Sequence, residues 1–224
     1  MPPQLYYITD RRQFPGDAQE QERRLLEKIV ECVSAGVDLV QLREKDLSAR
    51  ALEELALKAM AAVAGPRTRL LINARTDVAL ACGAHGLHLP ANDLAASEVR
   101  AIFARAGVSE PVIGVSTHSA SEVASAEAHG ADFAVFAPVF EKHGTVSREG
   151  LEQLRQICHR AVAAQPPLPV FALGGITLEN ARLCVEAGAA GIAAIRLFQQ
   201  NDVQTIVKKL REALSAGNPS GDRP

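Results

Sequence analysis

Short apolar runs recur along this chain and are separated by longer stretches of mixed polarity. Four of the runs repeat one pattern, in which a glycine and one or two small or acidic residues precede a strand-length apolar segment. They lie at 35–42, 82–89, 129–136 and 187–195. Four weaker runs fall between them, at 5–9, 69–73, 111–116 and 168–174. Runs of this length, bounded by Gly, Pro or polar residues, are typical of parallel strands buried on both faces.

The stretches between the apolar runs predict helices. The expected helices span 19–35, 48–64, 75–82, 96–106, 119–129, 149–164, 178–187 and 202–215. Ser48, Ser119 and Thr177 stand where a side-chain oxygen can cap a first helical turn. The glycines of the repeated pattern follow helix ends, where a left-handed backbone conformation favours Gly. They are Gly36, Gly83, Gly130 and Gly188.

Strict alternation of strand and helix predicts an α/β fold of the (β/α)8 TIM-barrel class, and 224 residues fit the lower part of its size range. A doubly wound open sheet is the alternative. We find no internal linker, so residues 1–214 are expected to form a single barrel domain. Residues 215–224 are rich in Pro, Gly and Ser and are predicted to be a disordered tail.

Composition narrows the classes of protein to which the chain can belong. A hydrophobic content of 47% with 22% charged residues is ordinary for one globular domain, and a net charge of −2 gives no electrostatic case for nucleic acid. The N-terminus lacks a basic segment followed by an apolar one, and no run reaches membrane-spanning length. We therefore predict a cytoplasmic protein without a membrane partner, and a homo-oligomer stays open. Buried, reduced thiols are expected at Cys32, Cys82, Cys158 and Cys184, which show no C-x-x-C spacing.

Polar residues follow the predicted strands at their C-terminal ends, where barrels of this kind assemble their active sites. These residues include cations, amides, hydroxyls, carboxylates and imidazoles. In chain order they are Thr9, Asp10, Arg43, Glu44, Lys45, Asn73, His88, Asp93, Ser116, Thr117, His118, Gly174, Gly175 and Arg196. The sixth strand is followed by a longer polar loop at 138–150. The sequence therefore predicts one functional rim.

The second strand ends in a pair of cations. Strand periodicity places Gln41, Arg43 and Lys45 on one face. A guanidinium that binds oxygens in a bidentate fashion, together with an ammonium, suits phosphate or pyrophosphate. The alternative is a solvated charge cluster, since Glu44 and Asp46 lie beside them.

A second anion pocket is predicted after strands seven and eight. Gly174 and Gly175 let the backbone approach a ligand closely, and a following helix start offers unpaired amides. Phosphate sites recur at this place in such barrels, so the turn before Arg196 would form the other half of the pocket. The alternative for Arg196 is a surface residue that caps a loop.

Two histidines are candidates for proton transfer. His118 stands at a strand end with a hydroxyl residue on each side, and an imidazole is the side chain best suited to a proton shuttle near neutral pH. A histidine that merely caps the following helix is the alternative. His88 lies within a strand, where it is either a site residue or a core histidine whose hydrogen bonds are satisfied.

Several motifs in order resemble the thiamine phosphate synthase and TenI family. They are QLREK, LLIN, GLHL followed by Asp93, IGVSTHS, PVF, LGGIT and AGAAGIA, and together they cover nearly the whole chain. The resemblance implies a barrel that acts on thiazole phosphate in thiamine biosynthesis. It also implies a small-molecule phosphate substrate as the partner.

Within this family, the synthase ionises a pyrimidine pyrophosphate to a carbocation-like species, which the thiazole nitrogen captures as pyrophosphate leaves. The resemblance implies that Asp93 ligates Mg2+ and that Arg43 and Lys45 hold the pyrophosphate. The full set of residues expected to contact substrate is Gln41, Arg43, Lys45, Asn73, Ser116, Lys142, Gly174, Gly175 and Arg196.

Two departures from the synthase pattern concern the metal and a substrate loop. Ala74 stands where the family has the Asp that is the second Mg2+ ligand, and the loop from Glu141 lacks the T-x-T-K signature. One carboxylate plus substrate phosphates can still hold Mg2+. Lys142 or Arg148 would have to replace the missing lysine.

The TenI branch shares these departures and keeps the histidine that matches His118. Its members are thiazole tautomerases, which need a phosphate anchor and one acid/base group but no metal. We therefore favour a tautomerase in which His118 transfers the proton, with the synthase as the alternative. A non-catalytic barrel that binds thiazole phosphate or thiamine phosphate is a third hypothesis.

Overall fold

The computed structural model describes residues 2–65, 67–141, 148–162 and 167–215. Lys142 and residues 216–224 of the predicted tail lie outside this part of the chain. None of the helices in the described residues is long and apolar enough to span a membrane.

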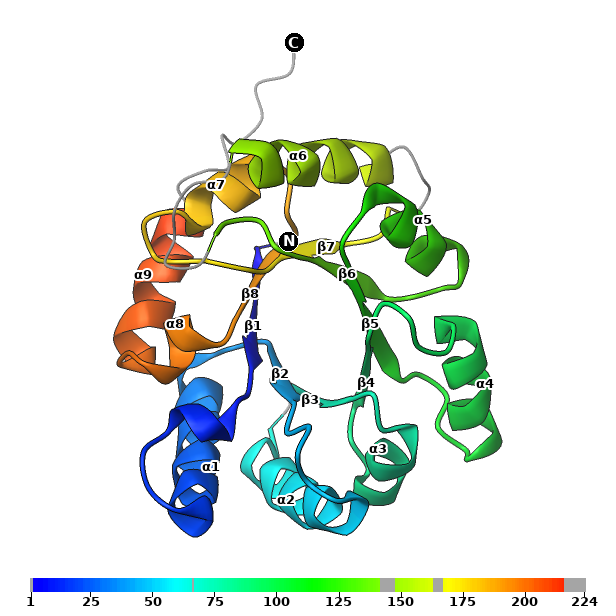
Figure 1. The fold of residues 1–224 in the computed structure, drawn as a ribbon, viewed down its shortest axis with the longest axis vertical. Helices are drawn as coiled ribbons and strands as arrows, with labels where there is room; N and C mark the ends of the chain where they lie inside the picture. The colour runs from blue at the N-terminus through cyan, green and yellow to red at the C-terminus, as the bar shows by residue number, and fades with distance from the viewer. Residues whose placement is uncertain (1, 66, 142–147, 163–166, 216–224) are drawn as a thin grey trace.

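Eight parallel strands close into a barrel in chain order, and β8 pairs back onto β1 (Figure 1). This closure confirms the predicted (β/α)8 barrel and rules out the open sheet. The strands are β1 (Gln4–Ile8), β2 (Leu39–Leu42), β3 (Arg69–Asn73), β4 (Gly86–Leu89), β5 (Val112–Thr117), β6 (Phe133–Phe136), β7 (Val170–Ala172) and β8 (Gly191–Ala194).

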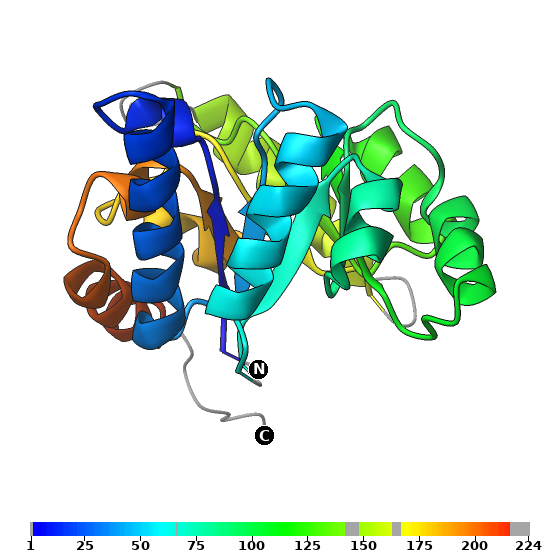
Figure 2. The same ribbon diagram turned by 90° about the horizontal axis from the view of Figure 1, so that it is seen from below.

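The main helices surround this barrel and lie close to their predicted positions. They are α1 (Ala18–Ala35), α2 (Ala49–Ala62), α3 (Thr76–Cys82), α4 (Ala96–Arg105), α5 (Ala120–Ala128), α6 (Arg148–Val162), α7 (Ala181–Glu186) and α9 (Val203–Ser215). Two short helices were not predicted, η1 (Arg11–Gln13) and α8 (Arg196–Gln199). Figure 2 shows β1 rising from the N-terminus toward η1. Because β2 runs parallel to β1, the loops after both strands emerge at the same end of the barrel.

The predicted helix ends are confirmed with one exception. Ser48 and Ser119 each accept a hydrogen bond from the backbone N–H three residues on, and Gly36 has the left-handed conformation with φ 82°. The prediction for Thr177 was wrong, because α7 begins only at Ala181. Asn180 instead accepts a hydrogen bond from the Thr177 N–H at 2.8 Å, which holds the preceding residues in a turn.

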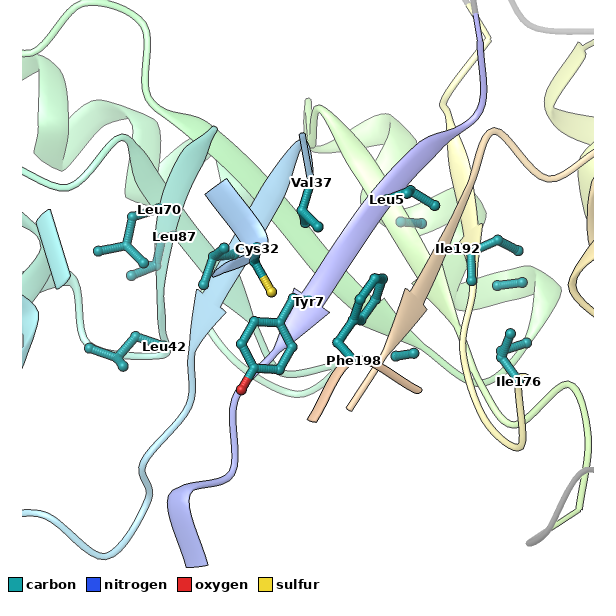
Figure 3. Close-up of a cluster of buried hydrophobic side chains, with 14 of the residues drawn as sticks. Leu5, Tyr7, Cys32, Val37, Leu42, Leu70, Leu87, Ile176, Ile192 and Phe198 are labelled. Carbon is teal, nitrogen blue, oxygen red and sulfur yellow. The ribbon is translucent and has the colours of Figure 1, made fainter. Parts of the chain in front are cut away.

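Side chains alternate between the barrel interior and the surrounding helices, so the core has two parts. Inside the barrel, Phe133 and Phe171 stack with ring centroids 4.9 Å apart and Tyr6 meets both edge-on. Outside it, alternate strand residues pack against the helices, and Figure 3 shows Tyr7 beside Phe198 in this outer part. The four cysteines are buried free thiols, as expected.

Candidate active site

The polar residues at the strand ends meet at one rim because the strands are parallel and in register. Asn73 pairs with His88 across β3 and β4, and β5 brings Ser116 beside His88. The residues predicted at the ends of β3, β4 and β5 thus become neighbours.

A hydrogen-bonded chain runs from the barrel interior to this rim. The Gln41 side-chain amide donates to the Tyr6 hydroxyl at 2.9 Å, and that hydroxyl lies 3.1 Å from His88 Nδ1. His88 Nε2 lies 2.9 Å from Ser116 Oγ. Gln41 and His88 are only 1% and 2% exposed, so they lie below the rim. The open question about His88 is thus answered: it is buried, but it is bonded to a residue of the predicted site.

The surroundings of this hydrogen-bonded chain keep the His88 ring neutral. Burial, with the positive charge of Arg43 as a second cause, lowers the pKa of His88 to about 3. Burial likewise raises the pKa of Tyr6 well above its ordinary value, so its hydroxyl stays protonated. Gln41 was predicted to contact substrate, but its amide N–H is used by Tyr6, and that role stays a prediction.

The predicted cation pair has no acidic partner within the described residues. Arg43 is half-buried, Lys45 is exposed, and neither side chain forms an ion pair or hydrogen bond there. The Arg43 backbone N–H donates to Thr9 Oγ1 at 2.9 Å, which ties the end of β2 to the end of β1. Two positive charges thus follow the end of β2 without a paired carboxylate among the described residues.

Arg11 explains why the neighbouring carboxylates do not neutralise these cations. It donates to Glu44 at 3.0 Å and binds Asp46 with both terminal nitrogens at 2.7 Å. Thr9 donates to the same Glu44 carboxylate at 2.6 Å. The alternative of a solvated charge cluster is therefore wrong for Glu44, which is 4% exposed. Burial raises the pKa of Glu44, whereas Arg11 lowers the pKa of Asp46.

The end of β3 carries an unusual backbone. Ala74 has a left-handed conformation with φ 60°, and its N–H donates to the His88 carbonyl at 2.9 Å. It is the one non-glycine residue with positive φ among those described. Asp, Asn and Gly adopt this conformation more readily than Ala. Arg75 is paired with Asp77 at 2.8 Å, so it does not point a vacant guanidinium at the rim.

Asp93 is an exposed carboxylate in the loop after β4, where it accepts a hydrogen bond from the Leu94 N–H at 2.8 Å. No cluster of three metal-ligating side chains exists within the described residues. One carboxylate at the rim fits the way in which Mg2+ is usually held, by one or two carboxylates together with substrate phosphates. The residues present thus suit a shared metal rather than a protein cage.

His118 follows β5 and is held in one orientation. Its Nδ1 lies 2.8 Å from the Ala137 carbonyl oxygen, and a carbonyl can only accept, so Nδ1 carries the proton. In the neutral form of the ring Nε2 is then the proton acceptor, and no described residue bonds to it. The helix-cap alternative is wrong, because Ser119 caps α5 while the His118 side chain reaches the loop after β6. Sequence reasoning could not identify Ala137, because a backbone carbonyl leaves no residue signature.

The glycines after β7 are required by a neighbouring loop. A Cβ on Gly174 would lie 2.9 Å from Pro138 Cα, and one on Gly175 would lie 2.2 Å from the Glu141 carbonyl oxygen. The close approach predicted for a ligand is thus made by the loop after β6, and ligand binding by these glycines stays a prediction. The expected helix start with unpaired amides was wrong, since α7 begins later.

Arg196 is exposed at the start of α8 and lines a cavity of about 480 Å3 together with Gly175, Thr177 and Lys209. This cavity lies between the loop after β7 and α8, the place predicted for the second anion pocket. Its size suits a small phosphorylated ligand, and its lining carries these two cations and the carboxylate of Glu179.

A family model described as thiamine monophosphate synthase matches residues 5–198. The chain belongs to the thiamine monophosphate synthase family. The resemblance inferred from the motifs is thereby confirmed. The thiamine-phosphate synthase of Syntrophomonas wolfei is 35% identical over 93% of this chain and 94% of its own length. That of Clostridium acetobutylicum is 34% identical over 85% and 84%. A thiamine phosphate pyrophosphorylase structure from Pyrococcus furiosus superposes with a TM-score of 0.77 at 30% identity and covers 96% of both chains.

Two residues that bond to predicted site residues or their neighbours were missed from the sequence. Tyr6 was assigned to an apolar strand, although its position in β1 points it into the barrel beside Gln41. Arg11 was not considered, because η1 was not predicted. Both act through residues more than thirty positions away in the chain.

Proposed function

We propose that this chain is a thiamine-phosphate synthase, which joins a hydroxymethylpyrimidine pyrophosphate to thiazole phosphate and releases pyrophosphate. The sequence alone favours the tautomerase, but the near full-length relatives are named thiamine-phosphate synthase. The observation that carries the proposal is the cation pair Arg43 and Lys45. It lacks an acidic partner in the described part of the chain because Arg11 binds Glu44 and Asp46. A tautomerase needs one phosphate anchor, whereas a synthase needs two.

In this proposal the leaving group is stabilised before the new bond forms. Arg43 and Lys45 hold the pyrophosphate and neutralise the charge that develops as its bond to the pyrimidine methylene breaks. Ser116 donates a hydrogen bond to the same group. Mg2+, held by Asp93 and the phosphate oxygens, would supply further charge neutralisation when bound. The packed aromatic side chains inside the barrel leave the rim as the route for substrate.

The thiazole phosphate is assigned to the cavity beside Arg196. Arg196 and Lys209 are the cations that would hold the phosphomonoester, with Arg196 the stronger candidate because Glu179 lies near Lys209. The cavity lies on the side of the rim that β7 and β8 form. The thiazole can then approach from a neighbouring part of the rim, because only β1 separates β8 from β2. Positioning of the two substrates accounts for much of the expected rate enhancement.

Thiazole tautomerase is the second candidate, and His118 is the observation that favours it. Its Nδ1 proton is fixed by the Ala137 carbonyl, which leaves Nε2 as a base at the rim. Proton transfer by this base requires neither the cation pair nor a metal.

The test is to supply purified protein with both synthase substrates and Mg2+, and separately with the non-aromatic thiazole tautomer. Thiamine phosphate formed over many turnovers supports the synthase, and isomerisation without it supports the tautomerase. Arg43→Ala and Lys45→Ala should each lower synthase kcat/KM by roughly tenfold to a thousandfold. Arg50→Ala is the matched control, because that exposed arginine is paired with Glu54. Equal activity of all three variants would contradict the assignment of the cation pair.

A further inference from the structure

We propose that the buried chain Gln41–Tyr6–His88 is a positioning relay that fixes the Ser116 hydroxyl as a hydrogen-bond donor toward an anionic oxygen of the substrate. The inference rests on the proposed function only for the identity of that substrate. The direction of the relay follows from the donors and acceptors of the protein itself.

The first step concerns Tyr6. The Gln41 Nε2 atom can only donate, so the Tyr6 oxygen accepts from it. A phenol has one proton, and the remaining polar atom at hydrogen-bond distance is His88 Nδ1, at 3.1 Å. Tyr6 is fully buried, so its proton has no solvent to reach. The Tyr6 hydroxyl therefore donates to His88 Nδ1.

The second step fixes the tautomer of His88. Because Nδ1 accepts from Tyr6, a neutral imidazole carries its proton on Nε2. The ring stays neutral because burial and Arg43 disfavour a second proton. His88 Nε2 then donates to Ser116 Oγ across 2.9 Å.

The third step reaches the rim. Ser116 Oγ accepts from His88, so its own proton is directed away from the ring. Ser116 is half-buried at the end of β5, where the chain of buried groups ends. Its proton is then presented to an acceptor such as a phosphate oxygen. Because His88 already supplies a donor to Ser116 Oγ, the hydroxyl proton is left for an acceptor on the ligand, which favours an anionic oxygen at this point.

The tautomer can be measured without any substrate. Nitrogen-15 NMR of the histidine rings should show His88 protonated at Nε2 and unprotonated at Nδ1 near neutral pH. Tyr6→Phe should abolish this strict preference while keeping the aromatic contacts with Phe133 and Phe171. Tyr7→Phe is the matched control, since this neighbouring buried tyrosine lies outside the relay. A wild-type His88 that carries its proton on Nδ1 would overturn the relay.

The consequence for binding is tested with inorganic pyrophosphate by calorimetry. Tyr6→Phe should weaken affinity by about three- to tenfold, the ratio that corresponds to one hydrogen bond of ordinary strength. Ser116→Ala should weaken it by a similar factor, and the double variant by no more than Ser116→Ala alone. Additive losses would show that Tyr6 acts through general structure and not through Ser116.

His88 variants give an independent check. His88→Gln keeps an amide N–H near the position of Nε2 and should retain most of the affinity, whereas His88→Leu should lose it to the same extent as Ser116→Ala. If His88→Gln and His88→Leu bind pyrophosphate equally, the donor role of His88 is refuted. If wild-type protein does not bind pyrophosphate, the proposed function fails, while the NMR tautomer still decides the direction of the relay.

Discussion

Replacing Tyr7 by Phe should stabilise the protein. The Tyr7 hydroxyl is the one buried side-chain polar atom without a hydrogen-bond partner in the described part of the chain. A buried donor left without a partner costs roughly 1–3 kcal/mol. The ring itself is fully buried and meets Phe198 at a centroid distance of 5.9 Å, a contact that Phe would keep (Figure 3). The free energy of unfolding should therefore rise by about 1–3 kcal/mol.

In a chain of this size, each kcal/mol shifts Tm by about 2–4 °C, so the expected increase is roughly 2–12 °C. Thermal unfolding followed by far-UV circular dichroism measures this shift, and urea unfolding measures the free energy. Circular dichroism is the probe because the chain has no Trp and only two Tyr to serve as fluorophores. Tyr6→Phe is the control, and it should lower the free energy of unfolding, since the Tyr6 hydroxyl has two hydrogen-bond partners. A stability loss in Tyr7→Phe would refute the reasoning and show that a buried partner satisfies this hydroxyl.

Three further predictions concern the rim. Ala74→Asp should raise Mg2+ affinity by about tenfold or more over Ala74→Asn, as measured by calorimetry. Both variants should change Tm similarly, because Asp and Asn each tolerate the positive φ of this position better than Ala does. Equal affinities would mean that the carboxylate does not reach the metal. His118→Asn should abolish any isomerisation while keeping thiazole phosphate binding, and unchanged turnover would remove His118 from its role. Arg11→Ala should destabilise the fold by about 3–5 kcal/mol near pH 7, because Glu44 loses its ion-pair partner. Burial raises the pKa of Glu44 above its value in the unfolded chain, so the folded variant takes up a proton at this carboxylate first as pH falls. The destabilisation caused by Arg11→Ala should therefore shrink as pH falls toward 4.5. A destabilisation that does not change with pH would contradict this account.

The barrel could be predicted from the sequence because each strand carries its own signal, a short apolar run with a glycine before it or a polar residue after it. Helix starts could be predicted where a nearby side chain caps the first turn, as Ser48 and Ser119 do. The prediction that Thr177 caps a helix failed because the Asn180 side chain bonds back to the Thr177 N–H and forms a turn before α7. Local chemistry thus explains both the success and the error.

The site could be predicted only as a set of residues at strand ends. The bonds between them join positions far apart in the chain, such as Tyr6 and His88 or Arg11 and Glu44, and no local pattern encodes such pairs. The tautomer of His118 likewise depends on a backbone carbonyl of the next loop. The hydrogen-bond partners of the site residues are therefore the part of the site that could be identified only from the three-dimensional structure.

The tight packing of the two glycines after β7 sets a rule for engineering this barrel. Gly175 leaves no room for a side chain against the Glu141 carbonyl, and Gly174 leaves none against Pro138. A graft of another family member's substrate loop must therefore keep the backbone path of residues 138–141 as an anchor. Exchange can begin only after Glu141, and both glycines must accompany any transplant of the anchor into a different scaffold.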